Sequence, residues 1–236
     1  MYRSYSENFM IKDMAAFQLQ PLADLGVLLR FETESACQSA FRSILASKSE
    51  AVLDLVCAYK ALAIYHNPAK IQLNQLESSI NEWLSEQPLD LNSETGKLHK
   101  VPCCYELGED LVEVARLTGL GKKEVVELHS ACVYTVHAIG FSPGFPYLGY
   151  LPEKLQGVAR LDSPRLKVPA GSVGLTGIQT GIYPQEKPGG WRLIGRTPLL
   201  LVDEEENYFP LKVGDGVKFE PITIKKFDSL KGSRLP

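Results

Sequence analysis

The sequence lacks the long apolar run that a membrane-spanning helix requires. Its longest unbroken apolar stretches, such as residues 198–202, have the length of a strand and fall far below the roughly 18 residues of a span. The first residues carry polar and charged side chains where a secretory signal would need a continuous apolar core. We therefore expect a soluble, cytoplasmic protein without a membrane partner.

An excess of basic charge is also missing. The 236 residues include 25 Lys and Arg against 28 Asp and Glu, which gives a net charge of −3. This balance provides no global basic field for a nucleic-acid backbone, so we expect no nucleic-acid partner. The five cysteines are an odd number in a chain of ordinary size, and they fit reduced thiols better than a disulfide framework.

Several motifs that would identify a chemistry are absent. The four histidines are scattered and Cys103-Cys104 lacks a second Cys/His pair, so no metal site is expected. There is no phosphate-binding loop and no dinucleotide fingerprint. Residues 140–144 match the G-x-S-x-G string of hydrolases, but Pro143 follows the serine and has no N–H for an oxyanion hole. We exclude a serine nucleophile on that ground.

The chain has 44% hydrophobic and 22% charged residues, which is enough to bury a core without disulfides. Before residue 100, short apolar runs alternate with amphipathic stretches in the order of a small split βαβ domain. This pattern predicts a strand at 26–31, a helix at 34–46 with Thr33 or Ser35 near its cap, one or two strands within 52–65 and a helix at 71–84. The turn-rich segment 89–97 predicts a linker between an α/β domain, residues 1–96, and a second domain, residues 97–236.

The second domain is predicted to begin with a strand and two helices and then to become β-rich. Helices are expected at 110–118 and 122–130, and strands at 97–105, 134–139, 172–175, 191–195, 199–202 and 216–219. Short strands separated by Gly and Pro turns indicate a barrel or a sandwich. The fold class of the whole chain is therefore expected to be α+β.

Residues 140–200 concentrate the unusual composition. They hold 11 of the 19 glycines and 8 of the 15 prolines, and seven basic residues against three acidic ones. A basic, glycine-rich segment in an acidic protein suggests a small anionic ligand. The candidate donors are the backbone at Gly189 and Gly190 and the side chains of Arg165, Ser172, Gln179, Thr180, Tyr183 and Arg196. The same segments fit the turns of a barrel with charged rims equally well.

Two features flank these donors. Pro143 and Gly144 predict a rigid loop, in which Phe145 and Tyr147 supply packing. His129 lies near the end of an amphipathic helix, where we expect a capping or interface residue, with proton transfer as the less favoured alternative.

Four ordered motifs identify a family. GFSPGFPYLGYLP at 140–152, PRLKVPAGSVG at 164–174, QTGIYP at 179–184 and PGGWRLIGRTP at 188–198 together resemble the KipI family. This family is also called 5-oxoprolinase subunit PxpB or allophanate hydrolase subunit 1. The resemblance implies an N-terminal α/β domain followed by a cyclophilin-like β-barrel, and it adds Trp191 and Thr197 to the expected substrate-binding residues.

The resemblance also implies a function. The chain would be a subunit of an ATP-dependent complex that opens 5-oxo-L-proline to L-glutamate, with KipA/PxpC-type and PxpA-type partners and with ATP shared with a partner subunit. Arg165 and Arg196 would suit the substrate carboxylate or developing phosphate charge. His66-Asn67-Pro68 and Cys103-Cys104-Tyr105 depart from the family pattern, which affects the expected partner specificity more than the barrel site.

Two other functions stay open at the level of sequence. A KipI-like inhibitor would bind a sensor histidine kinase and block its autophosphorylation, and Phe145, Tyr147 and Trp191 would then form an exposed apolar patch. A carboxyltransferase-half subunit of a biotin-dependent amide carboxylase is the other alternative. The polar donors of the 164–198 segment favour the enzyme, because a kinase-docking surface does not need them.

Overall fold

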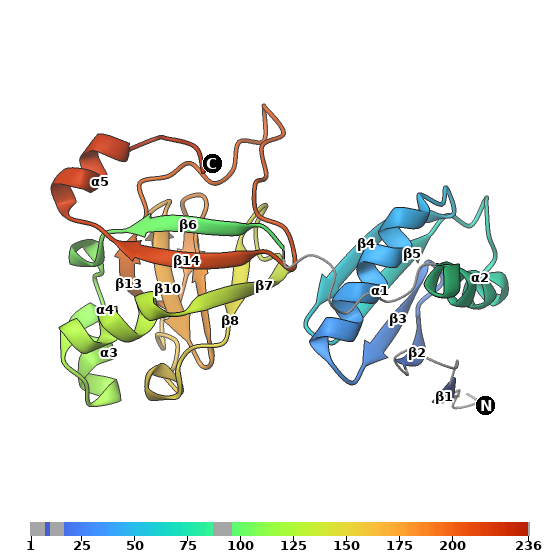
Figure 1. The fold of residues 1–236 in the computed structure, drawn as a ribbon, viewed down its shortest axis with the longest axis horizontal. Helices are drawn as coiled ribbons and strands as arrows, with labels where there is room; N and C mark the ends of the chain where they lie inside the picture. Colours follow the sequence, from blue (N-terminus) through green and yellow to red (C-terminus); the bar gives the residue numbers. More distant parts are fainter. Residues whose placement is uncertain (1–7, 10–16, 87–95, 236) are drawn as a thin grey trace. The chain divides into compact units, whose positions relative to one another are not determined.

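The computed structural model describes residues 8–9, 17–86 and 96–235, which belong to two units, residues 1–94 and 95–236 (Figure 1). Almost all of the predicted linker, 89–97, falls outside the described residues, so the boundary between 96 and 97 stays a prediction. Within the described parts of the chain, no helix is both long and apolar enough to cross a membrane.

The N-terminal unit is an antiparallel sheet with two helices. Its strand order is β1-β2-β3-β5-β4, and β5 is antiparallel to both of its neighbours. Strands β3 and β4 are therefore parallel, are connected through α1, and have β5 inserted between them, which is the predicted split βαβ arrangement. The elements are β1 (Asn8–Phe9), β2 (Phe17–Leu22), β3 (Gly26–Phe31), α1 (Glu34–Ser47), β4 (Val52–Ala58), β5 (Ala61–His66) and α2 (Leu73–Glu86).

Alternation along the strands explains which face of this sheet is covered. In β5, Leu62, Ile64 and His66 are buried and their neighbours are more exposed, as expected for a sheet with one protected face. Helix α1 packs on β3, β4 and β5 and on α2. The predicted cap of α1 is confirmed, because Thr33 Oγ1 accepts a hydrogen bond from the Ala36 N–H at 3.2 Å.

The second unit is a nearly closed seven-stranded sheet. Its strand order is β13-β10-β11-β8-β7-β14-β6, and the two edge strands meet where Cys104 N donates to Arg196 O at 2.8 Å and Arg196 N donates to Cys104 O at 3.0 Å. This is the expected cyclophilin-like barrel. The strands are β6 (Leu98–Cys103), β7 (Val133–Ile139), β8 (Pro146–Gly149), β10 (Ser172–Thr176), β11 (Gln179–Ile182), β13 (Arg192–Arg196) and β14 (Gly216–Pro221).

A small two-stranded sheet and several helices complete this unit. Strands β9 (Arg165–Val168) and β12 (Lys187–Gly189) pair with each other outside the main sheet. Helices α3 (Leu111–Thr118) and α4 (Lys122–Ala131) pack on each other, and α4 also packs on β14. In Figure 1 they lie at the lower left of this unit, and α5 (Ile224–Leu230) lies at its upper left. The short helices η1 (Tyr105–Leu107) and η2 (Glu153–Leu155) lie in loops.

The barrel unit has two hydrophobic clusters. The large cluster fills the barrel and includes Tyr134 and Phe219. The small cluster includes residues of β9 and β13, and consists of Phe145, Val168, Tyr183, Trp191 and Leu193, with Tyr147 packed against it. Four aromatic side chains from distant parts of this unit's sequence therefore gather in one place: Phe145, Tyr147, Tyr183 and Trp191.

One predicted strand is wrong. Residues 199–202 form only an isolated bridge between Leu200 and Arg234. Their backbone pairs with the C-terminal segment, since Leu200 N donates to Ser233 O at 2.8 Å. Leu201 and Val202 are buried, so the apolar run indicated burial and not membership of the sheet.

Candidate functional site

An aromatic cavity lies beside the small hydrophobic cluster of the barrel unit. Its volume is about 90 Å³, and its lining residues are Phe141, Phe145, Tyr147, Arg160, Tyr183, Gly189, Gly190 and Trp191. Five of these eight residues are aromatic, and one carries a guanidinium. Apolar walls with a few placed polar groups are typical of a small-molecule site.

Phe145 is the centre of the aromatic cluster. Its side chain is 1% exposed, and its ring centroid lies 5.0 Å from Tyr147, 5.2 Å from Tyr183 and 5.5 Å from Trp191. All three contacts have the edge-to-face geometry that the ring quadrupole favours. The walls of the cavity are therefore held by mutual aromatic packing.

The loop before Phe145 delivers it to this position. Phe145 N donates to Ser142 O at 3.1 Å, which closes the turn that contains Pro143. Gly144 has a φ of +70°, and a side chain there would run into Val202. Phe141 also has a positive φ, is 61% exposed and lies 5.4 Å from the Phe145 ring.

Arg160 is presented to the cavity by a short segment that is fixed on both sides. Gly177 N donates to Val158 O at 2.8 Å, and Leu161 N donates to Gly190 O at 2.8 Å. The Arg160 side chain is exposed and has no hydrogen-bond or ion-pair partner among the described residues. Its guanidinium is therefore available for a carboxylate or another anion.

Two positive charges act on the hydroxyl of Tyr183, which lines the cavity. Burial raises the pKa of its hydroxyl, while the backbone N–H of Trp191 and the positive charges of Arg160 and Arg165 act in the opposite direction. Gly189 has to be glycine because a Cβ there would run into the Tyr183 hydroxyl. The two arginines thus create a positive field at an uncharged phenol.

Arg165 is held by acidic partners. Its Nη2 lies 2.7 Å from Asp110 Oδ1, its Nε lies 3.3 Å from Glu109 Oε2, and Asp110 Oδ2 accepts from Leu193 N at 2.7 Å. The pair connects β9 to the start of α3 and to β13. Arg165 Nη1 is buried and has no hydrogen-bond partner among the described residues, which leaves one donor for water or a ligand.

Several predicted substrate-binding residues lie away from the cavity. Ser172 Oγ donates to Pro169 O at 2.7 Å, Arg196 Nε donates to Ala170 O at 2.8 Å, and Thr197 N donates to Gly171 O at 2.8 Å. These three residues stabilise one turn. Gln179 lies at the start of β11, opposite Gly149 of β8.

His129 is inside the barrel and not at a surface, so the expected interface role does not fit this structure. Its Nδ1 lies 2.7 Å from Tyr105 Oη, and its Nε2 lies 3.0 Å from Thr180 Oγ1. Thr180 Oγ1 donates to Gly174 O at 2.9 Å, so it accepts from His129 Nε2–H, and Nδ1 accepts from Tyr105. Burial lowers the pKa of His129 to about 3. This neutral imidazole and Thr180 form a structural network.

Sequence reasoning missed Arg160 and Phe141 as lining residues. Arg160 counts toward the basic charge of residues 140–200, but it belongs to none of the glycine-rich motifs. Its position depends on the bond between Leu161 and Gly190, which only the folded chain brings together. Phe141 lies within the first family motif. Its position beside the predicted rigid loop could have indicated that this aromatic residue lines the site.

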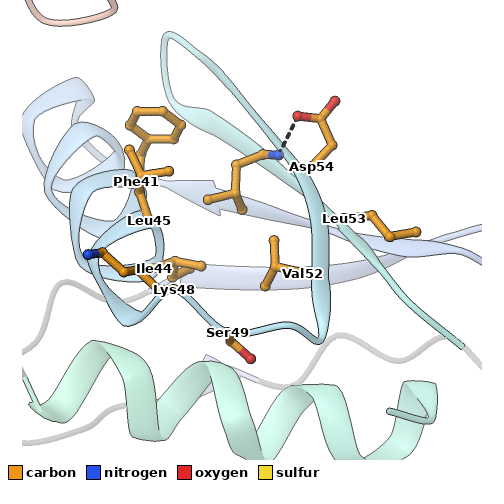
Figure 2. Close-up of a pocket in the computed structure, with 9 residues that line it drawn as sticks. Phe41, Ile44, Leu45, Lys48, Ser49, Val52, Leu53 and Asp54 are labelled. Atoms are coloured by element: carbon orange, nitrogen blue, oxygen red, sulfur yellow. Dashed lines mark hydrogen bonds between the residues drawn. The ribbon is translucent and has the colours of Figure 1, made fainter. Parts of the chain in front are cut away.

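A larger cavity lies in the N-terminal unit, between α1 and β4 (Figure 2). It has a volume of about 400 Å³, and Phe41, Ile44 and Leu45 of α1 face Val52–Leu55 of β4 across it. The Asp54 carboxylate already accepts from Leu55 N at 2.8 Å. Few polar groups converge on this cavity, so we take the smaller aromatic cavity as the candidate site despite its size.

The fold and the motifs define a carboxyltransferase-type module. Residues 17–211 match the family described as "Carboxyltransferase domain, subdomain C and D". A Bacillus subtilis protein named as the B subunit of 5-oxoprolinase is 34% identical over 234 residues, which cover 91% of this chain and 97% of that protein. An Escherichia coli O157:H7 protein of the same name is 45% identical over 161 residues, 67% of this chain and 72% of that protein. The chain belongs to the family of 5-oxoprolinase B subunits.

Solved structures agree with this assignment. TTHA0988 is 33% identical with a TM-score of 0.73, and the match covers 84% of this chain and 40% of that one. PH0987 from Pyrococcus horikoshii is 36% identical with a TM-score of 0.52, over 89% of this chain and 99% of that one. The K. lactis urea amidolyase, at 16% identity and a TM-score of 0.67, shares the fold.

Proposed function

We propose that this chain is the B subunit of a 5-oxoprolinase complex that uses ATP to open 5-oxo-L-proline to L-glutamate. The observation that carries the proposal is the similarity to the Bacillus subtilis 5-oxoprolinase B subunit, which extends over 97% of that protein. A subunit acts with others, and the partners we propose are a KipA/PxpC-type subunit and a PxpA-type subunit.

The aromatic cavity is the proposed binding place for the substrate. The substrate is a single small lactam ring with one carboxylate. The rings of Tyr147, Tyr183 and Trp191 offer an apolar wall for the lactam, and Arg160 offers an unpaired guanidinium for the carboxylate. Arg165 does not line the cavity, but its positive charge acts on the Tyr183 hydroxyl and adds to the field that attracts an anion.

Neither of the two cavities described above fits ATP. A cavity of about 90 Å³ is too small for a nucleoside triphosphate, which needs a site of several hundred Å³. The larger cavity is lined mainly by apolar side chains, with Lys48 as its one cation. We therefore place the small organic acid in this barrel and propose that ATP binds at a site shared with a partner subunit.

The two alternative functions receive less support. The apolar patch needed for kinase docking is not on the surface, since Phe145 is 1% exposed and Trp191 is 5% exposed. The curated relatives are named for 5-oxoprolinase, and these names do not favour a biotin-dependent carboxyltransferase.

The test is ADP release that depends on 5-oxoproline, measured with this chain and its partner subunits and with each one omitted in turn. Turnover should require this chain. Arg160→Ala should raise KM for 5-oxoproline about tenfold or more, because it removes a charge-assisted bond, and should change kcat less. Lys154→Ala is the matched control, since Lys154 is an exposed cation of the same segment that does not line the cavity.

Two results would count against the proposal. Unchanged ADP release without this chain would remove it from the reaction. An equal effect of Arg160→Ala and Lys154→Ala on KM would keep the subunit in the complex but would place the substrate outside the aromatic cavity.

A further inference from the structure

Two cysteines of the N-terminal unit are in contact. Cys37 lies on α1 and Cys57 on β4, and their Sγ atoms are 3.7 Å apart. Both side chains are buried, at 0% and 4% exposure. A disulfide bond is about 2.05 Å long, so the two sulfur atoms need to approach each other by less than 2 Å. All five cysteines are free thiols in this structure.

The two cysteines belong to the same two elements, α1 and β4, that line the larger cavity, which Figure 2 shows. Cys37 precedes the lining residue Phe41 by four positions, so the two side chains lie on the same face of α1. Cys57 follows the lining residue Leu55 by two positions on β4, so both point to the same side of the sheet. A covalent bond between them would link the two elements that line that cavity.

We propose that Cys37 and Cys57 form an intramolecular disulfide when hydrogen peroxide oxidises them, which links α1 to β4. This is a modification site in the N-terminal unit, separate from the barrel cavity. We name a small neutral peroxide as the oxidant because both thiols are buried, and a small molecule reaches a buried thiol more readily than a bulky disulfide reagent does.

The hydrogen bond within the pair determines the order of the steps. The two thiols share one hydrogen bond, which is the largest cause of both a raised pKa at Cys37 and a lowered pKa at Cys57. The Cys57 thiolate attacks a peroxide oxygen, the O–O bond breaks, and the products are a sulfenic acid and hydroxide. Cys37 sulfur then attacks Cys57 sulfur, the S–O bond breaks, and water leaves. Two thiols lose two electrons and two protons, and one peroxide becomes two waters.

The experiment uses the full chain, reduced and then exposed to hydrogen peroxide. After quenching with catalase, the protein is denatured, alkylated and analysed by peptide mass spectrometry. The expected product is a cross-link of the Cys37 and Cys57 peptides with the loss of two hydrogens. The oxidised protein should unfold at a higher temperature, by on the order of 10 °C, because the bond closes a loop of about 20 residues.

Variants assign the roles of the two thiols. In Cys37→Ser, dimedone present while the peroxide-treated protein is denatured should trap a sulfenic acid at Cys57, whereas Cys57→Ser should give no adduct at Cys37. Cys132→Ser is the matched control and should form the cross-link like the wild type, because Cys132 is half-buried and its Sγ contacts Leu128 O and no other thiol among the described residues. The proposal is wrong if peroxide oxidises Cys132 of the wild type while Cys37 and Cys57 remain free thiols, so that both are fully alkylated after denaturation.

Discussion

At the scale of single residues, His129 shows how a buried polar group can be part of a core. It is fully buried, its ring centroid lies 4.6 Å from that of Phe219, and both of its ring nitrogens have hydrogen-bond partners. Burial lowers its pKa from 6.5 to about 3. Between these values the unfolded chain binds a proton at His129 and the folded chain does not, so its contribution to stability is present above pH 6.5 and is lost as the pH falls.

Replacing His129 should therefore change the pH dependence of stability. We expect the free energy of unfolding of His129→Gln to fall less steeply between pH 6.5 and pH 5 than that of the wild type, by up to about 1.4 kcal/mol per pH unit. Tyr105→Phe is the control, because it removes the bond to Nδ1 but keeps the imidazole. Urea denaturation at several pH values measures both variants. Parallel pH profiles of wild type and His129→Gln would contradict the assignment.

The candidate site divides residue by residue into what the sequence could predict and what it could not. Tyr183, Gly189 and Trp191 were predicted and line the cavity, because the family motifs mark them directly. Thr180 was predicted as a substrate ligand, but its hydroxyl serves His129 inside the barrel. The direction in which a strand residue points depends on the register of the sheet, and a short segment of sequence does not specify that register.

At the scale of elements, periodicity predicted the long elements and failed for the short ones. Residues 26–31, GVLLRF, form a short apolar run of strand length, and β3 has those bounds. Strand β12 consists of Lys187, Pro188 and Gly189 and offers no alternation at all. Its position depends on pairing with β9, which lies far away in sequence. Glycine-rich strands of a curled barrel are specified by such pairings and by close backbone approach.

The turn that follows β12 gives a prediction based on sterics alone. A Cβ on Gly189 would run into the Tyr183 hydroxyl, whereas a Cβ on Gly190 would have its nearest neighbours at 3.7 Å, and neither glycine has a left-handed backbone. Gly189→Ala should therefore destabilise the barrel unit by about 1–3 kcal/mol, as overpacking does. Gly190→Ala should stay within about 0.5 kcal/mol of the wild type.

The fluorescence of Trp191, followed through urea denaturation in a Trp83→Phe background, measures both glycine variants. If the two substitutions lower the free energy of unfolding equally, then the Tyr183 side chain moves away from the added methyl group at little cost. The cavity wall would then be less rigid than its aromatic packing indicates.

At the scale of the whole molecule, the chain carries one tryptophan in each unit. Trp83 lies on α2 and is half-buried, and Trp191 lies in the small hydrophobic cluster of the barrel unit. Each unit also has its own buried core. Leu62 is fully buried in the first unit, and Tyr134 is fully buried in the second. Separate cores and separate fluorophores make it possible to ask whether the proposed domains unfold as independent bodies.

Leu62→Ala answers that question. Removing this side chain from a closed core should cost about 2–5 kcal/mol of unfolding free energy in the N-terminal unit. In a Trp191→Phe background, Trp83 should then report a lower urea midpoint, while Trp191 in a Trp83→Phe background should keep its midpoint. Two domains with independent cores require this difference, because Leu62 belongs to the core of one unit only. Equal shifts of the two midpoints would mean that the chain unfolds as a single cooperative body. The boundary between residues 96 and 97 would then divide two sequence patterns but not two folding units.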